Sequence, residues 1–352
     1  MMGKFESDEE VIFMTTVCIH YFSGTGNTKR AVDVITGELQ KNGYEVQQFA
    51  ITDLEPAPTG NGDFNIFAFS TLSWSAPVLV KKYLHRLPEG LGKKAAVLAV
   101  YAGEPGQAIV KIEQLLEKKG FDVFLSGGAL YPNNWSQMTN PPTAGEAKEI
   151  LAGGDRMALD FAERFCKGEQ RLISKEKAGS FFTRFAALSF GLFGRRFLGK
   201  AYIADSHCNR CGLCAQTCPV HTIKVTGVIS KKPHWKFNCE DCARCINICP
   251  QKAIQVSMPK LIIHFLLLFA GIGGCFRAAG FTASMLFGAF QIIGWIASFG
   301  ITLLVFLWLQ FVVIDRFIFL LEQIPAFRRF FEKSLTKNSN RYVAPGYKPE
   351  RW

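Results

Sequence analysis

The chain has 352 residues, of which 49% are hydrophobic and 32 are phenylalanine, and its formal net charge is +11. The length predicts two or three domains, and the apolar content predicts that part of the chain lies in lipid. A basic chain can bind nucleic acid or an anionic membrane surface. Because no nucleic-acid-binding motif is present, the composition favours the membrane and excludes a nucleic-acid partner.

The chain begins with MMGKFESDEE, which contains no apolar stretch and predicts no signal peptide. We therefore expect a cytoplasmic setting, where cysteines stay reduced. Three of the 11 cysteines lie apart in apolar or helical surroundings and are predicted to be small buried side chains: Cys18, Cys166 and Cys275.

Residues 1–168 begin with a candidate phosphate-binding loop. A short apolar strand at Val17–Tyr21 runs into a glycine-, serine- and threonine-rich loop, and a helical pattern follows to about Lys41. Glycines let backbone N–H groups approach an anion, hydroxyls add donors, and the helix N-terminus adds its dipole. The loop is neither G-x-G-x-x-G nor a P-loop. Its candidate binding residues are Ser23, Gly24, Thr25, Gly26, Asn27 and Thr28.

Strand and helix patterns alternate through the rest of these residues. Further apolar runs lie at Glu45–Ala50, Phe64–Ser70, Lys94–Tyr101 and Phe121–Ala129, and helical patterns lie at Val78–His85, Gln107–Lys119 and Ala144–Lys167. Such alternation predicts βαβ units and an α/β, doubly wound parallel sheet of order 2-1-3-4-5. A ligand would then bind at the carboxyl ends of the strands.

The loop resembles the S/T-x-T-G-x-T phosphate loop of flavodoxins, which bind FMN. This resemblance implies that two more loops wrap the flavin ring, through Thr71, Leu72, Ser73, Trp74, Tyr101, Ala102 and Gly103. Trp74 and Tyr101 are the candidates for stacking on the ring, and ordinary packing is the alternative for each. Residues 131–135 resemble a Pro-Asn-Asn/Asp-Tyr segment of flavodoxin–ferredoxin fusion proteins, which adds Asn134.

Residues 169–201 form a basic connector. Seven lysines and arginines stand against two glutamates and alternate with phenylalanines. This pattern predicts an amphipathic helix lying on an anionic leaflet, and a helix docked between two domains is the alternative. Glycines at 179, 191, 194 and 199 argue against one unbroken helix.

Residues 202–257 carry two runs of C-x₂-C-x₂-C-x₃-C-P, which begin at Cys208 and Cys239. The spacing is typical of small α+β bacterial-type ferredoxins with two [4Fe–4S] clusters, where the fourth cysteine of each run ligates the other cluster. A zinc site and a disulfide framework are the weaker alternatives. The predicted ligands are Cys208, Cys211, Cys214 and Cys249 for one cluster, and Cys239, Cys242, Cys245 and Cys218 for the other.

Residues 258–316 predict a helical transmembrane hairpin, because Arg277 is the only formal charge between Leu261 and Ile314. We expect a first span from Leu261 to about Cys275, a second from about Ser284, and Arg277 at the far interface. A buried helical domain is the alternative. Basic residues on both flanks place the cofactor domains in the cytoplasm by the positive-inside rule. Residues 317–352 predict a second basic amphipathic segment, broken at Pro325.

His264 lies one turn inside the first predicted span. Polar groups in spans are costly and often functional, so this histidine is a candidate for binding a quinone headgroup. The alternative is a histidine that stays hydrated near the interface. No second histidine lies in the spans to complete a bis-histidine heme site.

Over residues 14–256 the chain resembles flavodoxin–ferredoxin fusion proteins. The resemblance implies a cell-membrane protein that passes low-potential electrons between FMN, two [4Fe–4S] clusters and a membrane partner, either a quinone or a membrane redox enzyme. A soluble low-potential donor would supply the electrons. One alternative is an FMN-dependent reductase of a small organic substrate, fed by the clusters. Another is a redox sensor or assembly scaffold. No catalytic acid–base group is evident in the sequence.

Overall fold

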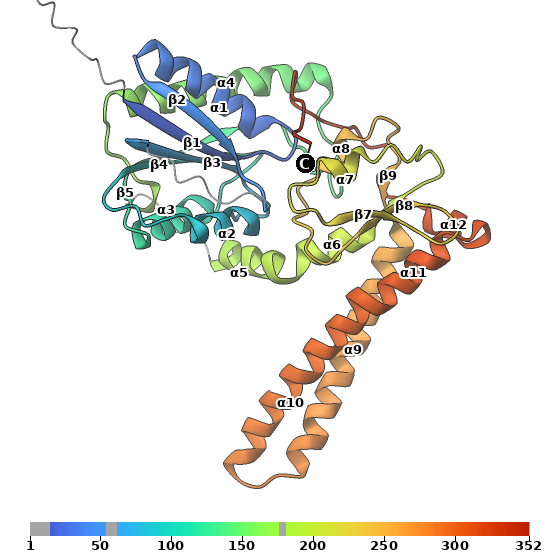
Figure 1. Ribbon diagram of the computed structural model, residues 1–352. Helices are drawn as coiled ribbons and strands as arrows, with labels where there is room; N and C mark the ends of the chain where they lie inside the picture. The colour runs from blue at the N-terminus through green and yellow to red at the C-terminus, as the bar shows by residue number, and fades with distance from the viewer. Residues whose placement is uncertain (1–14, 54–61, 176–180, 352) are drawn as a thin grey trace, which may run out of the picture.

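The computed structural model describes residues 15–53, 62–175 and 181–351. The first ten residues, from which no signal peptide is predicted, lie outside them. Figure 1 shows an N-terminal α/β domain, a smaller domain beside it, and two long helices that project away from the smaller domain.

The N-terminal domain is built on a five-stranded parallel sheet of order β2-β1-β3-β4-β5. β1, β3 and β4 consist almost entirely of buried residues, as parallel strands covered on both faces require. This order confirms the predicted doubly wound, flavodoxin-like fold. The strands are β1 (Thr16–Phe22), β2 (Glu45–Ala50), β3 (Phe64–Ser70), β4 (Lys94–Tyr101) and β5 (Asp122–Leu130).

Four helices cover this sheet, two on each face (Figure 1). α1 (Asn27–Lys41) and α4 (Ala144–Cys166) lie on one face, and α2 (Val78–Arg86) and α3 (Ala108–Lys118) lie on the other. The apolar core on the α2–α3 side continues into the smaller domain. The two domains therefore pack as neighbours with a shared interior.

A helical run links the domains. α5 (Phe181–Ser189), a π-helical turn η2 (Phe190–Gly194) and α6 (Arg195–Ala201) follow a short 3₁₀ turn, η1 (Ile173–Lys175). The glycines at 191 and 194 lie in this π-helical turn, which separates the two α-helices, while Gly199 lies within α6 and Gly179 lies outside the described residues.

The two ends of the connector differ in their surroundings. Arg184 and Phe185 are exposed, as an interfacial helix would require. Arg195 and Lys200 are buried instead, because each pairs with an acid from a distant part of the chain, Glu240 and Asp315 respectively. The α6 end of the connector is therefore docked between domains.

The smaller domain contains two short antiparallel ribbons and two one-turn helices. The cysteine runs share a backbone repeat: left-handed residues occur at equivalent places, Arg210, Gly212 and His221 in the first run and Asp241, Ala243 and Lys252 in the second. The elements are β6 (Tyr202–Ala204) paired with β9 (Ile254–Val256), β7 (Ile223–Thr226) paired with β8 (Lys232–Trp235), α7 (Leu213–Gln216) and α8 (Arg244–Ile248).

Two helices of the described residues are long and apolar enough to cross a membrane, by length and composition. The first is α9 (Met258–Ser284), which starts at an N-cap, Ser257, that accepts a hydrogen bond from the Lys260 N–H. The second runs through α10 (Ala289–Trp308), a π-helical turn η3 (Leu309–Ile314) and α11 (Asp315–Glu322).

The hairpin differs from the prediction at its far end. α9 continues past Arg277 to Ser284, so Arg277 lies inside the helix and the turn follows later than predicted. At the near end, α12 (Pro325–Phe331) begins at Pro325, where the sequence predicts a break.

The remaining residues, 332–351, return to the cofactor domains and are called the C-terminal strap. The strap first follows β9, where the Val256 N–H donates to Thr336 Oγ1. It ends beside the first loop of the α/β domain, where the Ala344 N–H donates to the Thr25 carbonyl. The sequence predicts only a basic amphipathic tail for this segment.

Candidate cofactor sites

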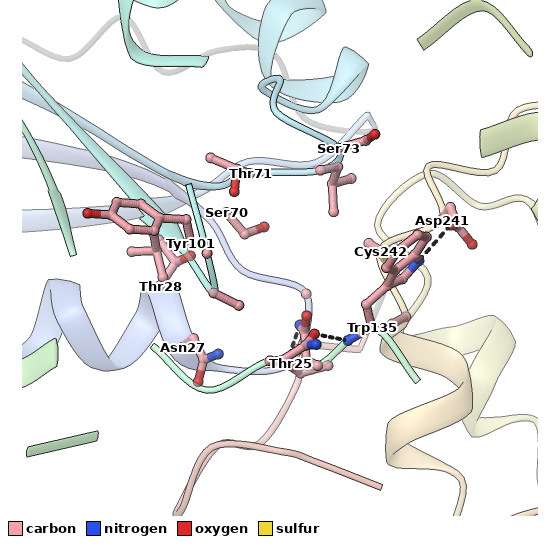
Figure 2. A pocket seen from close by; sticks show the side chains of 18 of the residues that line it. Thr25, Asn27, Thr28, Ser70, Thr71, Ser73, Tyr101, Trp135, Asp241 and Cys242 are labelled. Atoms are coloured by element: carbon pink, nitrogen blue, oxygen red, sulfur yellow. Dashed lines mark hydrogen bonds between the residues drawn. The ribbon is translucent and has the colours of Figure 1, made fainter. Parts of the chain in front are cut away.

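A cavity of about 330 Å3 lies at the carboxyl ends of the parallel strands. Four loops of the α/β domain line it, and Figure 2 shows Tyr101 and Thr28 at one end, with Trp135, Cys242 and Asp241 at the other. Every predicted flavin-site residue except Gly26 lines the cavity: Ser23, Gly24, Thr25, Asn27, Thr28, Thr71, Leu72, Ser73, Trp74, Tyr101, Ala102, Gly103 and Asn134.

The first loop is shaped to face an anion. Gly26 adopts a left-handed conformation, φ 103°, directly before α1, and its N–H donates to Ser23 Oγ. Asn134 Nδ2 donates to Thr25 Oγ1 at 2.7 Å, which holds the fourth loop against the first. The Thr28 hydroxyl is fully buried and has no hydrogen-bond partner among the described residues. A buried orphan hydroxyl at a helix N-terminus fits a bound phosphate.

Gly26 itself faces away from the cavity. A Cβ at this position would lie 2.6 Å from Cβ of Tyr347 and 2.8 Å from Cβ of Ala344. The glycine is therefore required for its backbone angle and for the close approach of the C-terminal strap.

The second loop is a tight turn held in an unusual conformation. Ser73 and Trp74 both have positive φ, and the backbones of Leu72 and Ser75 exchange two hydrogen bonds around them. Non-glycine residues in this region are costly and cluster at functional sites. The turn fixes Trp74 in the cavity wall, consistent with a role beside a flavin ring.

Tyr101 is placed less favourably for stacking. A Cβ at Gly128 would lie 2.5 Å from the Tyr101 ring, so the ring packs closely on β5. Burial also raises the pKa of the Tyr101 hydroxyl.

The smaller domain and the connector close the cavity on its far side. Four of these residues escaped the sequence prediction, because only domain packing brings them here: Phe190, Asp241, Cys242 and Ala243. Trp135 also lines the cavity and donates to Asp241 Oδ2 at 3.3 Å. The sequence signal that could have identified Trp135 as a lining residue is its place as an aromatic residue in the loop of residues 131–135.

Arg244 fastens this interface. Its buried guanidinium donates to the carbonyls of Ser23 and Gly24 in the first loop, at 2.5 and 2.9 Å, and to the Thr217 carbonyl at 2.7 Å. It also donates to the Tyr347 hydroxyl of the C-terminal strap. One side chain thus joins the phosphate loop, both cysteine runs and the strap.

The eight cysteines of the two runs are free thiols that fall into two groups. One surface cavity of the smaller domain is lined by Cys208, Cys211, Cys214 and Cys249. The pKa of the Cys214 thiol is raised to about 12 by burial and by three neighbouring thiols, those of Cys208, Cys249 and Cys211. The structure therefore brings one predicted ligand set together around a single cavity.

The second group lies deeper. Burial raises the pKa of the Cys242 thiol to about 12, and the neighbouring Cys218 thiol adds to the shift. Burial also raises the pKa values of the Cys239 and Cys245 thiols, and the neighbouring Cys242 thiol adds to both shifts. Such thiols ionise when a bound metal compensates the charge.

The described residues contain no group of three or more His, Cys, Asp or Glu side chains that converges on a single ion. Thiolates that bind the separate irons of a cube are held apart by the cube itself, whereas zinc ligands meet at one point. The two four-cysteine groups fit clusters in this respect.

The sheet and the cysteine runs together define a fusion of a flavodoxin-like α/β domain with an iron–sulfur domain. Residues 200–250 match the family described as "4Fe-4S dicluster domain". Residues 200–250 of this chain are accordingly an iron–sulfur domain of the 4Fe-4S dicluster type.

Solved flavodoxins resemble the N-terminal part. One from the domain Archaea is 19% identical, covering 43% of this chain and 99% of its own, with a TM-score of 0.30. The two-electron reduced flavodoxin of Megasphaera elsdenii is 21% identical, covers 40% of this chain and 98% of its own, and has a TM-score of 0.30. Flavodoxin 2 from Bacillus cereus is 22% identical over 43% and 99%, TM-score 0.31. No curated protein matches the chain.

Proposed function

We propose that this chain is a membrane-bound electron-transfer protein that holds FMN in the 330 Å3 cavity and one [4Fe–4S] cluster in each cysteine group. The observation that supports this most is the position of Cys242. This residue belongs to the buried cysteine group and also lines the flavin cavity. A flavin exchanges two electrons and a cluster one, so a shared wall gives a short path between them.

The phosphate end of the cavity favours FMN. The C-terminal strap packs behind the phosphate loop, with Tyr347 and Ala344 against Gly26. The Tyr342 hydroxyl donates to Asn27 Oδ1 at 2.8 Å, within the first turn of α1. A terminal phosphate suits this closed end, where a longer dinucleotide would need a continuing groove.

The exposed cysteine group is the proposed docking point of a soluble low-potential donor. Cys211 is exposed and its neighbours Asn209 and Arg210 project into solvent. The buried group then lies between this point and the flavin. The chain would carry electrons singly through the two clusters.

The hairpin is proposed to span the cell membrane, with the cofactor domains on the cytoplasmic side. Its outer surface is apolar, with Phe281, Phe290 and Leu304 all more than 60% exposed. Cations and exposed phenylalanines gather at its base on α12, where they would meet an anionic leaflet: Arg329, Lys333, Phe327 and Phe330. The electron acceptor would be a quinone or a membrane redox enzyme.

The test uses full-length protein purified anaerobically, with flavin and iron counted. The flavin is reduced photochemically, and cluster reduction is followed by rapid-freeze EPR. A Cβ at Gly24 would lie 2.6 Å from the Cys242 carbonyl oxygen, so Gly24→Ala should push the loop from the iron–sulfur domain and slow transfer by at least about tenfold.

Gly103→Ala is the matched control, because Gly103 also lines the cavity but a Cβ there has nothing within 4 Å. Equal rates in Gly24→Ala and Gly103→Ala, or no transfer in the parent protein, would contradict the proposed path. A protein truncated after Ser257 would not serve as a control without the hairpin, because the truncation would also remove the C-terminal strap.

A further inference from the structure

A group of buried polar residues lies where the hairpin meets the iron–sulfur domain. Asp315, at the start of α11, is its centre. Asp315 Oδ2 lies 2.6 Å from Lys200 Nζ and 2.9 Å from His234 Nε2, and Asp315 Oδ1 lies 3.5 Å from His264 Nε2. Lys200, His264 and Asp315 are each at most 3% exposed.

This group has unused hydrogen-bonding capacity. Neither ring nitrogen of His264 has a hydrogen-bond partner among the described residues, and the same holds for Gln310 Oε1 and Asp315 Oδ1. The 3.5 Å approach of His264 to Asp315 lacks hydrogen-bond geometry. Buried polar atoms are nearly always paired, so these atoms indicate a missing partner that both donates and accepts.

The π-helical turn η3 presents one of these residues. Gln310 Nε2 donates to the His264 carbonyl at 2.6 Å, and its buried Oε1 has no partner among the described residues. π-Helical turns within α-helices are frequent at functional sites. An apolar anchor needs neither the turn nor the imidazole, and ionisable groups in such helices are costly.

Aromatic rings cover His264 on the hairpin side. The Phe311 ring stacks on it at 5.6 Å between centroids, and the Phe197 ring meets Phe311 edge-on at 6.4 Å. Phe265, which also contacts Phe197, is half exposed on the apolar surface of α9. A flat headgroup would enter from lipid through this aromatic wall by displacing rings.

The group also lies beside a proposed cluster ligand. Lys200 Nζ donates to the Trp235 carbonyl at 2.8 Å. The preceding residue, Gly199, approaches Cys239 so closely that a Cβ there would lie 2.6 Å from Cys239 Cβ. Adjacent residues of α6 therefore contact the buried cysteine group, through Gly199, and Asp315, through Lys200.

We infer that His264, Gln310 and Asp315 form a binding site for the headgroup of a quinone, which accepts electrons from the buried cluster. This inference rests on the proposed function. Reduction of the quinone needs two electrons, which a cluster held by Cys239 and its group would supply one at a time and a flavin in the cavity would replenish. Each carbonyl oxygen of the quinone gains one proton and becomes a hydroxyl. The protons would come from solvent water at His234, which is 14% exposed and lies 2.9 Å from Asp315 Oδ2.

The test measures binding apart from turnover. Oxidised full-length protein in nanodiscs is titrated with a short-chain menaquinone analogue by calorimetry. His264→Phe removes a donor to a quinone carbonyl and should weaken binding about 10- to 100-fold, as loss of a buried hydrogen bond does. Gln310→Leu removes an acceptor that only a hydroxyl can use, so it should weaken binding of the hydroquinone form of the analogue by a similar factor. His264→Asn keeps hydrogen-bonding atoms and should recover part of the affinity, which a purely structural role would not give.

Gln291→Leu is the matched control, since Gln291 lies at the far end of α10, where its side-chain Nε2 donates to the Leu286 carbonyl. Its affinity should equal that of the parent protein. Absence of saturable binding in the parent, or equal binding in His264→Phe, would overturn the site. Flavin-to-cluster transfer, measured in the same samples, tests the proposed function separately, because binding to oxidised protein does not depend on it.

Discussion

The two cysteine runs have the same spacing and the same left-handed backbone positions, yet they lie in opposite surroundings. Between its first two cysteines the first run carries Asn209 and Arg210, both exposed. The second run carries Glu240 and Asp241 at the equivalent places, both buried. Glu240 accepts from the Val78 N–H at the start of α2, and Asp241 accepts from Gln137, Trp135 and Tyr202.

The difference shows how one motif serves two tasks. The spacing fixes the ligand geometry in both runs, while the two intervening residues decide what each run faces. Polar residues leave the first run open to an external partner. Buried acids tie the second run to the α/β domain, where each acid finds donors across the domain boundary.

The largest expected effect comes from replacing the fourth cysteine of each run with alanine, one run at a time. Cys218→Ala should abolish the buried cluster and leave the exposed one, with a loss of roughly four irons, because the fourth cysteine ligates the other cluster. Cys249→Ala should do the reverse. Iron analysis and EPR of reduced protein distinguish the two. Loss of the exposed cluster from Cys218→Ala would mean that each run ligates only its own cluster.

A smaller effect is expected at the paired positions Glu240 and Asn209. Glu240 Oε1 lies 3.2 Å from Arg195 Nη1, and both side chains are buried. Glu240→Ala leaves that cation unpaired and should lower the free energy of unfolding by about 3 kcal/mol. Asn209→Ala, at the exposed position, should cost under about 1 kcal/mol. Anaerobic guanidinium unfolding measures both, and equal losses would remove the distinction between the runs.

The smallest effect concerns Gly212 and Ala243, which share a left-handed conformation with φ of 76° and 58°. Gly212→Ala should cost about 1 kcal/mol through backbone strain, because a Cβ there meets only Gln216 Nε2, at 3.8 Å. Ala243→Gly should change stability by less than about 1 kcal/mol, since relief of strain offsets the lost burial of a methyl group. The same unfolding experiment measures both changes. A large loss of unfolding free energy in Ala243→Gly would show that packing of the Ala243 methyl group outweighs the relief of backbone strain.

Local sequence patterns were sufficient for much of this structure. The central strands of the large sheet, β1, β3 and β4, are mostly apolar runs, and the bounds of all five strands agree with the prediction within a residue or two. The phosphate loop follows from glycine and hydroxyl residues between a strand and a helix. The two apolar helices follow from their length without charge.

Contacts between distant segments could not be predicted. Arg195 and Lys200 look like interfacial cations until Glu240 and Asp315 are placed beside them. Phe190 and Cys242 reach the flavin cavity only because the connector and the iron–sulfur domain dock against its mouth. The sequence holds no periodic signal for such pairings, since each depends on how separately folded pieces pack.

The position of the C-terminal strap implies an order of assembly during synthesis of this protein. A ribosome releases the α/β domain and both cysteine runs long before residues 342–347, which complete the back of the phosphate loop. The apolar helices are synthesised in between. If these helices enter the bilayer during translation, as proposed, the nucleotide end of the flavin site is finished only after insertion. Firm retention of flavin would then be confined to molecules that have already reached the membrane.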